Sequence, residues 1–149
     1  MSTTIFTAKE FNPEKQRRRR QRVALVVSIL IVVGGLFYMF RFWPYEHRVD
    51  RFLTAVENRD YQHAYAIWQN DSQWQQHPER YKKYPFSDFY NDWGPSGEWG
   101  IIKEHKIDGA ASPKTGGTGV IVQVTVNQRV EKLRLWVERQ DKTITWSPY

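Results

Sequence analysis

The sequence predicts an α+β protein in which an N-terminal transmembrane helix is followed by a small domain of helices packed on a curved antiparallel sheet. Three observations support this fold class. Residues 23–40 form an apolar run without a charge, residues 45–68 and 86–93 show helical periodicity, and segments between residues 100 and 147 alternate apolar and polar side chains as strands do. Helices followed by consecutive strands with short connections are typical of an α+β arrangement.

The apolar run Val23–Phe40, VALVVSILIVVGGLFYMF, is long enough to cross a membrane as a helix. Its eighteen residues would span about 27 Å, and a snorkelling Arg41 with Phe42 and Trp43 as interfacial aromatics extends the expected span to 23–43. A buried core helix is the first alternative, but nothing else in the chain could surround so uniformly apolar a rod. A cleaved signal peptide is the second, but RFWPYEH offers no small-x-small cleavage site.

The charge distribution predicts the orientation of this span. Eight basic and two acidic residues precede Pro44, which accounts for the whole net charge of +6, while residues 44–149 carry 14 basic and 14 acidic residues. The run KQRRRRQR therefore marks residues 1–22 as a cytoplasmic basic tail, and residues 44–149 as an extracytoplasmic domain. The run could also contact anionic headgroups. Because the domain is neutral, we expect no nucleic-acid binding.

The setting that fits best is a bacterial inner membrane, with the lipid bilayer as one partner and other membrane or envelope proteins as further candidates. Within the span, the small residues Ala24, Ser28 and Gly35 lie near one helical face, which predicts possible self-association through the span. The chain has no cysteine, which excludes disulfides, thiolate metal sites and thiol nucleophiles. The polar segment Met1–Gln16 is expected to be disordered.

Three helices are expected in the extracytoplasmic domain. The first is Tyr45–Asn58, the second follows Asp60 as its N-cap, and the third is Phe86–Trp93, each with apolar residues on one face. Gly94, followed by a proline, is expected to end the third helix with a positive φ.

Four antiparallel strands are expected to follow, joined by short turns except for a long flexible connection over Asp108–Thr118. The expected strands are Gly100–Asp108, Gly119–Gln128, Glu131–Arg139 and Lys142–Ser147. Residues 71–84 are expected to be irregular or weakly helical.

The segment VDRFLTAVENRDYQHAYAIW, residues 49–68, resembles the entry of the cystatin-like and NTF2-like group, in which two helices joined at an Asn/Asp break precede a sheet. The resemblance covers residues 44–149 as an order of elements. It implies a cone between helices and sheet, in which some members bind small apolar ligands and the enzymes place an acid/base residue. Other members are one-span scaffold components of type IV secretion machines. No residue of this sequence matches the acid/base position.

Motifs for chemistry are missing from the sequence. The histidines at 47, 63, 77 and 105 are 16, 14 and 28 residues apart, which does not match a helical metal motif. No nucleophile elbow, phosphate loop or dinucleotide fingerprint is present. We therefore predict no catalytic, cofactor-binding or metal-binding residues, and a protein that is not an enzyme.

The aromatic residues are the unusual feature of the sequence. They either fill the core or line a pocket or partner surface, and the residues expected there are Tyr65, Trp68, Tyr90, Trp93, Trp99 and Trp136. Trp136 lies on the polar face of its strand, where it could contact a partner or the membrane surface. The favoured prediction is a membrane-anchored, non-enzymatic binding or scaffold domain. The alternative is an apolar-ligand-binding or isomerase-like pocket protein of the NTF2-like group.

Overall fold

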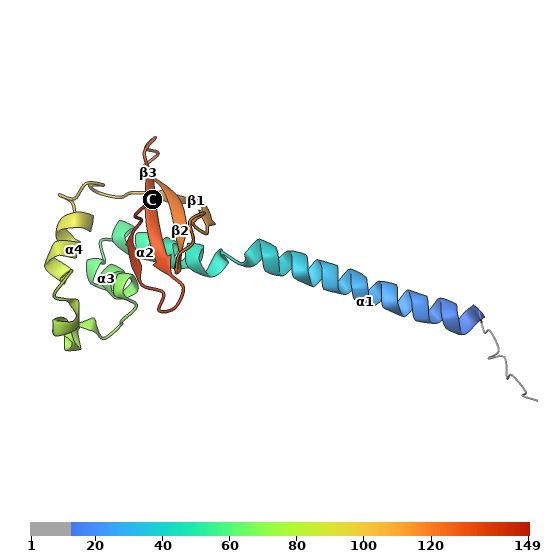
Figure 1. The fold of residues 1–149 in the computed structure, drawn as a ribbon. Helices are drawn as coiled ribbons and strands as arrows, with labels where there is room; N and C mark the ends of the chain where they lie inside the picture. Colours follow the sequence, from blue (N-terminus) through green and yellow to red (C-terminus); the bar gives the residue numbers. More distant parts are fainter. Residues whose placement is uncertain (1–12) are drawn as a thin grey trace, which may run out of the picture. The chain divides into compact units, whose positions relative to one another are not determined.

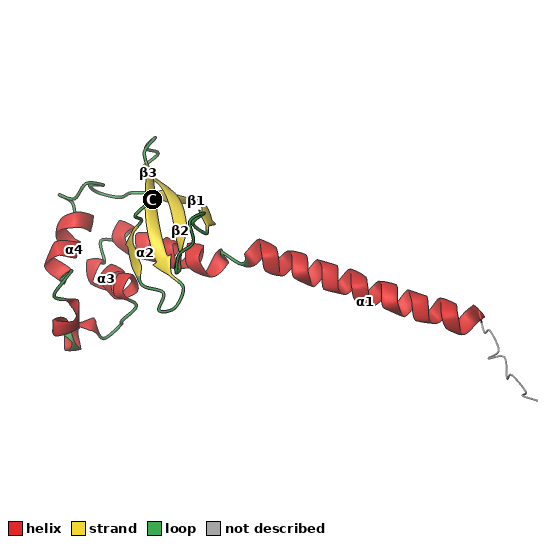
Figure 2. Cartoon of the chain, viewed as in Figure 1, coloured by secondary structure: helices red, strands yellow, loops and turns green. Residues whose placement is uncertain are grey.

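The computed structural model describes residues 13–149, which divide into two compact units between Arg41 and Phe42. Figure 1 shows the element order, and Figure 2 distinguishes helices, strands and loops. The bounds predicted for the span, 23–43, remain a prediction, with one helix ending at Phe40 and the next beginning at Trp43.

The first unit is the helix α1, Pro13–Phe40, whose 28 residues are exposed along its length. It is long and apolar enough to cross a membrane, judged by length and composition. Proline is accepted at the first helical position and arginine is a good helix former, so the helix begins well before the apolar run. The expected disorder of Met1–Gln16 is therefore wrong for Pro13–Gln16, and its first twelve residues lie outside the described part of the chain.

The helices of the second unit agree with the sequence-based expectation. They are α2, Trp43–Glu57, α3, Tyr61–Gln69, and α4, Phe86–Trp93. Asp60 is the N-cap of α3, because its side chain accepts a hydrogen bond from the backbone N–H of His63 at 3.1 Å. Residues 71–84 contain two short 3₁₀ helices, Trp74–Gln76 and Pro78–Tyr81, within irregular chain.

The sheet has four antiparallel strands in the order β1-β2-β3-β4. They are β1, His105–Ala111, β2, Gly119–Val126, β3, Lys132–Glu138, and β4, Ile144–Trp146. Asn127 and Gln128 both have positive φ, 48° and 57°, which a tight hairpin turn requires. The turn fixes the register in which Val122 faces Leu135. The α+β class and the four strands are therefore confirmed.

The predicted bounds of the first strand, Gly100–Asp108, are wrong, and so is the predicted start of the long connection. The backbone N–H groups of Lys103 and Glu104 donate to the side-chain oxygen of Asn127, at 2.8 and 3.3 Å, instead of to a neighbouring strand. The ladder of β1 starts at His105 and runs through Ala111.

The core lies between one face of the sheet and the helices. In Figure 1, α2 runs behind the sheet while α3 and α4 lie to one side of it. Alternate residues of β2 and β3 are fully or almost fully buried, as expected for strands with one covered face. The buried hydrophobic residues from these strands and α2 are Val120, Val122, Val124, Val126, Leu133, Leu135, Val137, Val49, Phe52, Leu53, Ala55 and Val56.

The end of α4 corrects one expectation. Gly94 has φ −77° and ψ −176°, so the predicted positive φ is wrong. Glycine is needed there for space, because a Cβ at this position would lie 2.4 Å from the carbonyl oxygen of Tyr90. Gly97 is tighter still, with a Cβ position 1.9 Å from the carbonyl oxygen of Asp92. The segment after α4 is therefore a close-packed corner.

Candidate functional site

Three of the aromatic residues predicted for a pocket form part of the core. Tyr65, Trp68 and Trp93 are 1%, 2% and 1% exposed. Their rings pack against Phe52 and Phe89 at centroid distances of 4.8 to 5.8 Å, two pairs edge to face and two tilted. Trp146 of β4 closes this cluster by stacking on Trp93 at 4.8 Å with an interplanar angle of 5°. Rings this well covered do not line an open cavity.

Of the other three predicted residues, Trp99 also belongs to the buried core, whereas Tyr90 and Trp136 do not. Trp99 is 5% exposed, and the guanidinium of Arg129 lies 5.3 Å from its ring centroid. Tyr90 is 42% exposed and packs edge to face on Tyr61. Trp136 is half-buried on the opposite face of the sheet, where its ring lies so close to Gly119 that a Cβ there would be 2.3 Å away.

The buried interior carries no chemistry of its own. Within residues 13–149, no polar or charged residue belongs to the buried set. The indole N–H groups of Trp93 and Trp99 have no hydrogen-bond partner in this part of the chain. The described core cluster contains no carboxylate or imidazole, and the nearly buried imidazole of His105 lies beside it, at the contact between α2 and β1.

A cluster of titratable side chains joins α2 to β1. The ring of His105 has Nδ1 2.5 Å from Oε1 of Glu57 and Nε2 3.0 Å from Oδ1 of Asp50. The His105 side chain is 7% exposed, against 22% for Glu57 and 49% for Asp50. Asp50 and Glu57 are two helical turns apart and so lie on the same face of α2.

This geometry fixes the orientation of the imidazole and occupies both of its nitrogen atoms. Carboxylate oxygens only accept hydrogen bonds, so two such contacts require a further proton in the cluster, either on the ring or on a carboxyl. A general base needs a nitrogen lone pair directed at a substrate, and both nitrogens of His105 face carboxylates. The described residues contain no group of histidine and carboxylate side chains suited to a metal ion.

A shallow hollow lies beside this cluster. It is lined by Trp43, Glu46, His47, Asp50, Ile107, Asp108 and Gly109. The rings of Trp43 and His47 stack at 5.0 Å along its edge. Asp108 is already engaged, because a hydrogen bond from Thr125 at 2.8 Å, helped by Lys132, lowers the pKa of its carboxyl. The hollow is thus a polar surface feature of the domain.

Exposed apolar side chains gather at the end of the domain that holds the β2–β3 turn. Val130 is 96% exposed and Ile101 is 43% exposed. Two contacts fix them at the same end: the Asn127 side-chain amide donates to the Ile101 carbonyl at 2.9 Å, and Arg129 donates to the Trp99 carbonyl at 3.3 Å. The turn therefore holds Val130 in a fixed and almost wholly exposed position.

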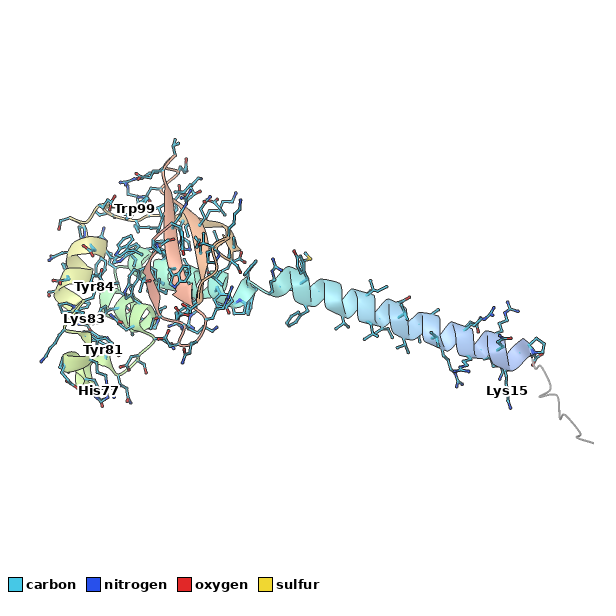
Figure 3. The ribbon with its side chains drawn as sticks, in the orientation of Figure 1. Lys15, His77, Tyr81, Lys83, Tyr84 and Trp99 are labelled. Carbon is cyan, nitrogen blue, oxygen red and sulfur yellow. The ribbon has the colours of Figure 1, made fainter. Side chains whose placement is uncertain are left out.

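Two tyrosines hold the segment between α3 and α4, where Figure 3 labels them. Tyr84 donates to Asp92 at 2.7 Å, and burial followed by this bond raises the pKa of the Tyr84 hydroxyl. Tyr81 donates to Asp71 at 2.6 Å, and burial with this bond raises the pKa of Tyr81 to about 12. Both hydroxyls therefore act as neutral donors within the fold.

Sequence reasoning missed the His105 cluster and the exposed turn. The spacing of the four histidines indicates only whether they match a metal-binding motif. The carboxylate partners of His105 lie 48 and 55 residues earlier in the chain, too far for a local pattern. The seven-residue spacing of Asp50 and Glu57 on a predicted helix was the available signal. No local signal marks Val130 as exposed.

Comparison with known protein families, curated proteins and solved structures finds no match to this chain.

Proposed function

We propose that this chain is a single-pass membrane protein whose extracytoplasmic domain is a non-enzymatic binding or scaffold module. The long apolar helix α1 and the basic run at its start support an anchor with a cytoplasmic N-terminus in a bacterial inner membrane. The order of elements after Phe42 supports a cystatin-like or NTF2-like domain.

The filled aromatic core is the observation that supports a binding role over catalysis. Tyr65, Trp68 and Trp93 are almost fully covered by other rings, so they occupy the space that an apolar ligand would need. The isomerase-like alternative would need a free carboxylate in that space. Asp50 and Glu57 are instead paired with His105, and Asp92, next to Trp93, accepts a hydrogen bond from Tyr84. Binding is then a property of the surface.

The end of the domain defined by Ile101 and Val130 is the proposed contact surface for another envelope protein. A photocrosslinking residue at position 130, in membranes of the native host, is expected to capture a discrete partner, while the same residue at the exposed position Lys114 captures less. Val130→Glu should weaken copurification of that partner and leave stability within about 0.5 kcal/mol, because the side chain is almost wholly exposed. A partner retained at full level by Val130→Glu would contradict this surface.

The proposed topology is tested separately. A reporter that is active only outside the cytoplasm, fused after Tyr149, should be active in membrane-inserted protein. An inactive fusion in inserted protein would overturn the orientation, whatever the crosslinking shows.

A further inference from the structure

We propose that α1 carries a binding site for one anionic phospholipid, with the phosphate on Arg19 and Arg20 and the start of an acyl chain against Val23, Ala24 and Val27. The site rests on the proposed membrane anchoring, and it adds a specific ligand to that anchor.

The site is a hollow on one face of the helix. It is lined by Gln16, Arg19, Arg20, Val23, Ala24 and Val27. The spacings of three, one, three, one and three residues place all six on one face of α1. Ala24 creates the depression, because its methyl group lies between the longer side chains of Arg20 and Val27. The lining changes from polar to apolar along about 17 Å of helix, as a phospholipid does from its headgroup to its chains.

The position of the hollow along α1 matches the membrane interface. The charge-free run begins at Val23, so Arg19 and Arg20 lie within about one helical turn of its start. Their long side chains can reach headgroup phosphates while Val23 and Val27 contact hydrocarbon. Figure 3 shows the side chains of this basic end, with Lys15 labelled near the start of the helix.

The charge of the hollow favours an anionic occupant. One guanidinium group can bind a phosphate through two parallel hydrogen bonds, and the hollow is lined by two arginines, Arg19 and Arg20. Neither Arg19 nor Arg20 has a carboxylate partner within residues 13–149. Glu14 is the only acidic residue of α1, and among the described residues it forms no ion pair with either arginine. Both positive charges can therefore interact with a ligand.

A second copy of α1 is the competing occupant, since Ala24 also belongs to the small-residue face with Ser28 and Gly35. Two copies inserted with the same orientation would bring both Arg19–Arg20 pairs together without a counter-charge. That repulsion makes a phospholipid the better fit to the arginine end of the hollow.

The test uses the full chain reconstituted in phosphatidylcholine bilayers with spin-labelled phosphatidylglycerol or spin-labelled phosphatidylcholine. Electron paramagnetic resonance measures the fraction of motionally restricted lipid, from which the relative association constant follows. We expect the parent to prefer phosphatidylglycerol. Arg19→Gln with Arg20→Gln should reduce this preference by about fivefold per arginine. The matched pair Arg17→Gln with Arg18→Gln removes the same charge outside the hollow and should have a much smaller effect.

Ala24→Leu fills the depression without changing a charge, and we expect it to reduce the preference as well. Leu25→Phe adds bulk at the same depth on the opposite face and should not. Equal losses in the two arginine pairs, or no effect of Ala24→Leu, would show diffuse attraction by the basic run and overturn the site. A dimer in crosslinking that Ala24→Leu abolishes, with lipid preference unchanged, would assign the hollow to a second copy. Release of the parent from membranes by alkaline carbonate would instead refute the anchoring and, with it, the site.

Discussion

Truncation of Trp99 separates a structural role from that of a ligand lid. The residue is 5% exposed and follows the corner at Gly94 and Gly97. Replacing a buried tryptophan by alanine costs about 3 to 5 kcal/mol through lost contacts and the cavity left behind. The Trp99 indole N–H has no partner within residues 13–149, so removing it recovers about 1 kcal/mol of desolvation cost. We expect Trp99→Ala to destabilise the domain by about 2 to 4 kcal/mol.

Trp99→Phe sharpens the test. It keeps a ring under Arg129 and removes the unpartnered N–H, so the small cavity and the recovered desolvation should offset each other to within about 1 kcal/mol. Thermal and urea unfolding of the full chain in detergent measure both variants, with the exposed Val130→Ala as control. A loss of 2 kcal/mol should lower the melting temperature by at least about 8 °C. A Trp99→Ala protein that melts like the Val130→Ala control would refute the structural role.

Three further predictions concern the corner, the tyrosines and the α2–β1 cluster. Gly97→Ala should cost about 1 to 3 kcal/mol in urea unfolding, because its Cβ would meet the backbone oxygen of Asp92 at 1.9 Å, whereas exposed Ser96→Ala should be neutral. Folding raises the pKa of the Tyr84 hydroxyl, so its contribution to the free energy of unfolding is fully present below about pH 10 and is lost as the pH rises further. The decrease in stability above about pH 10 should be shallower in Tyr84→Phe than in Tyr149→Phe. His105→Ala should cost about 1 to 3 kcal/mol by leaving two carboxylates without their partner, and adding Glu57→Gln should restore part of that loss.

The helices were predictable from the sequence because their signals are local. The residues that indicate the apolar face of α2 and the N-cap at Asp60 lie within one or two helical turns of each other in the sequence. The start of β1 was not predictable in the same way. Ile101 and Ile102 suggested a strand, whereas the pairing partner of that segment is the side chain of Asn127, 24 residues later. Gly109, Ala110 and Ala111, which do pair with β2, have low strand propensity.

The candidate site was less predictable than the fold. The sequence indicated that the aromatic residues matter, and it left open whether they fill a core or line a pocket. Only the packing of Tyr65, Trp68 and Trp93 against one another and against Phe89 answers that question, because burial depends on contacts among α3, α4 and β4. The His105 cluster depends in the same way on β1 lying against α2.

The division between core and surface also explains why sequence motifs say little about the role of this protein. A domain without cysteine depends on apolar burial, and here tryptophan and tyrosine rings supply much of it. Rings used in this way are unavailable to a ligand, so the proposed binding role would depend on residues that contribute little to folding. Val130 is such a residue: its side chain is 96% exposed, and its removal should change binding rather than stability. Single exposed side chains on a fixed turn leave no periodic pattern in a sequence, so the proposal for this surface depends on their exposure in the folded domain.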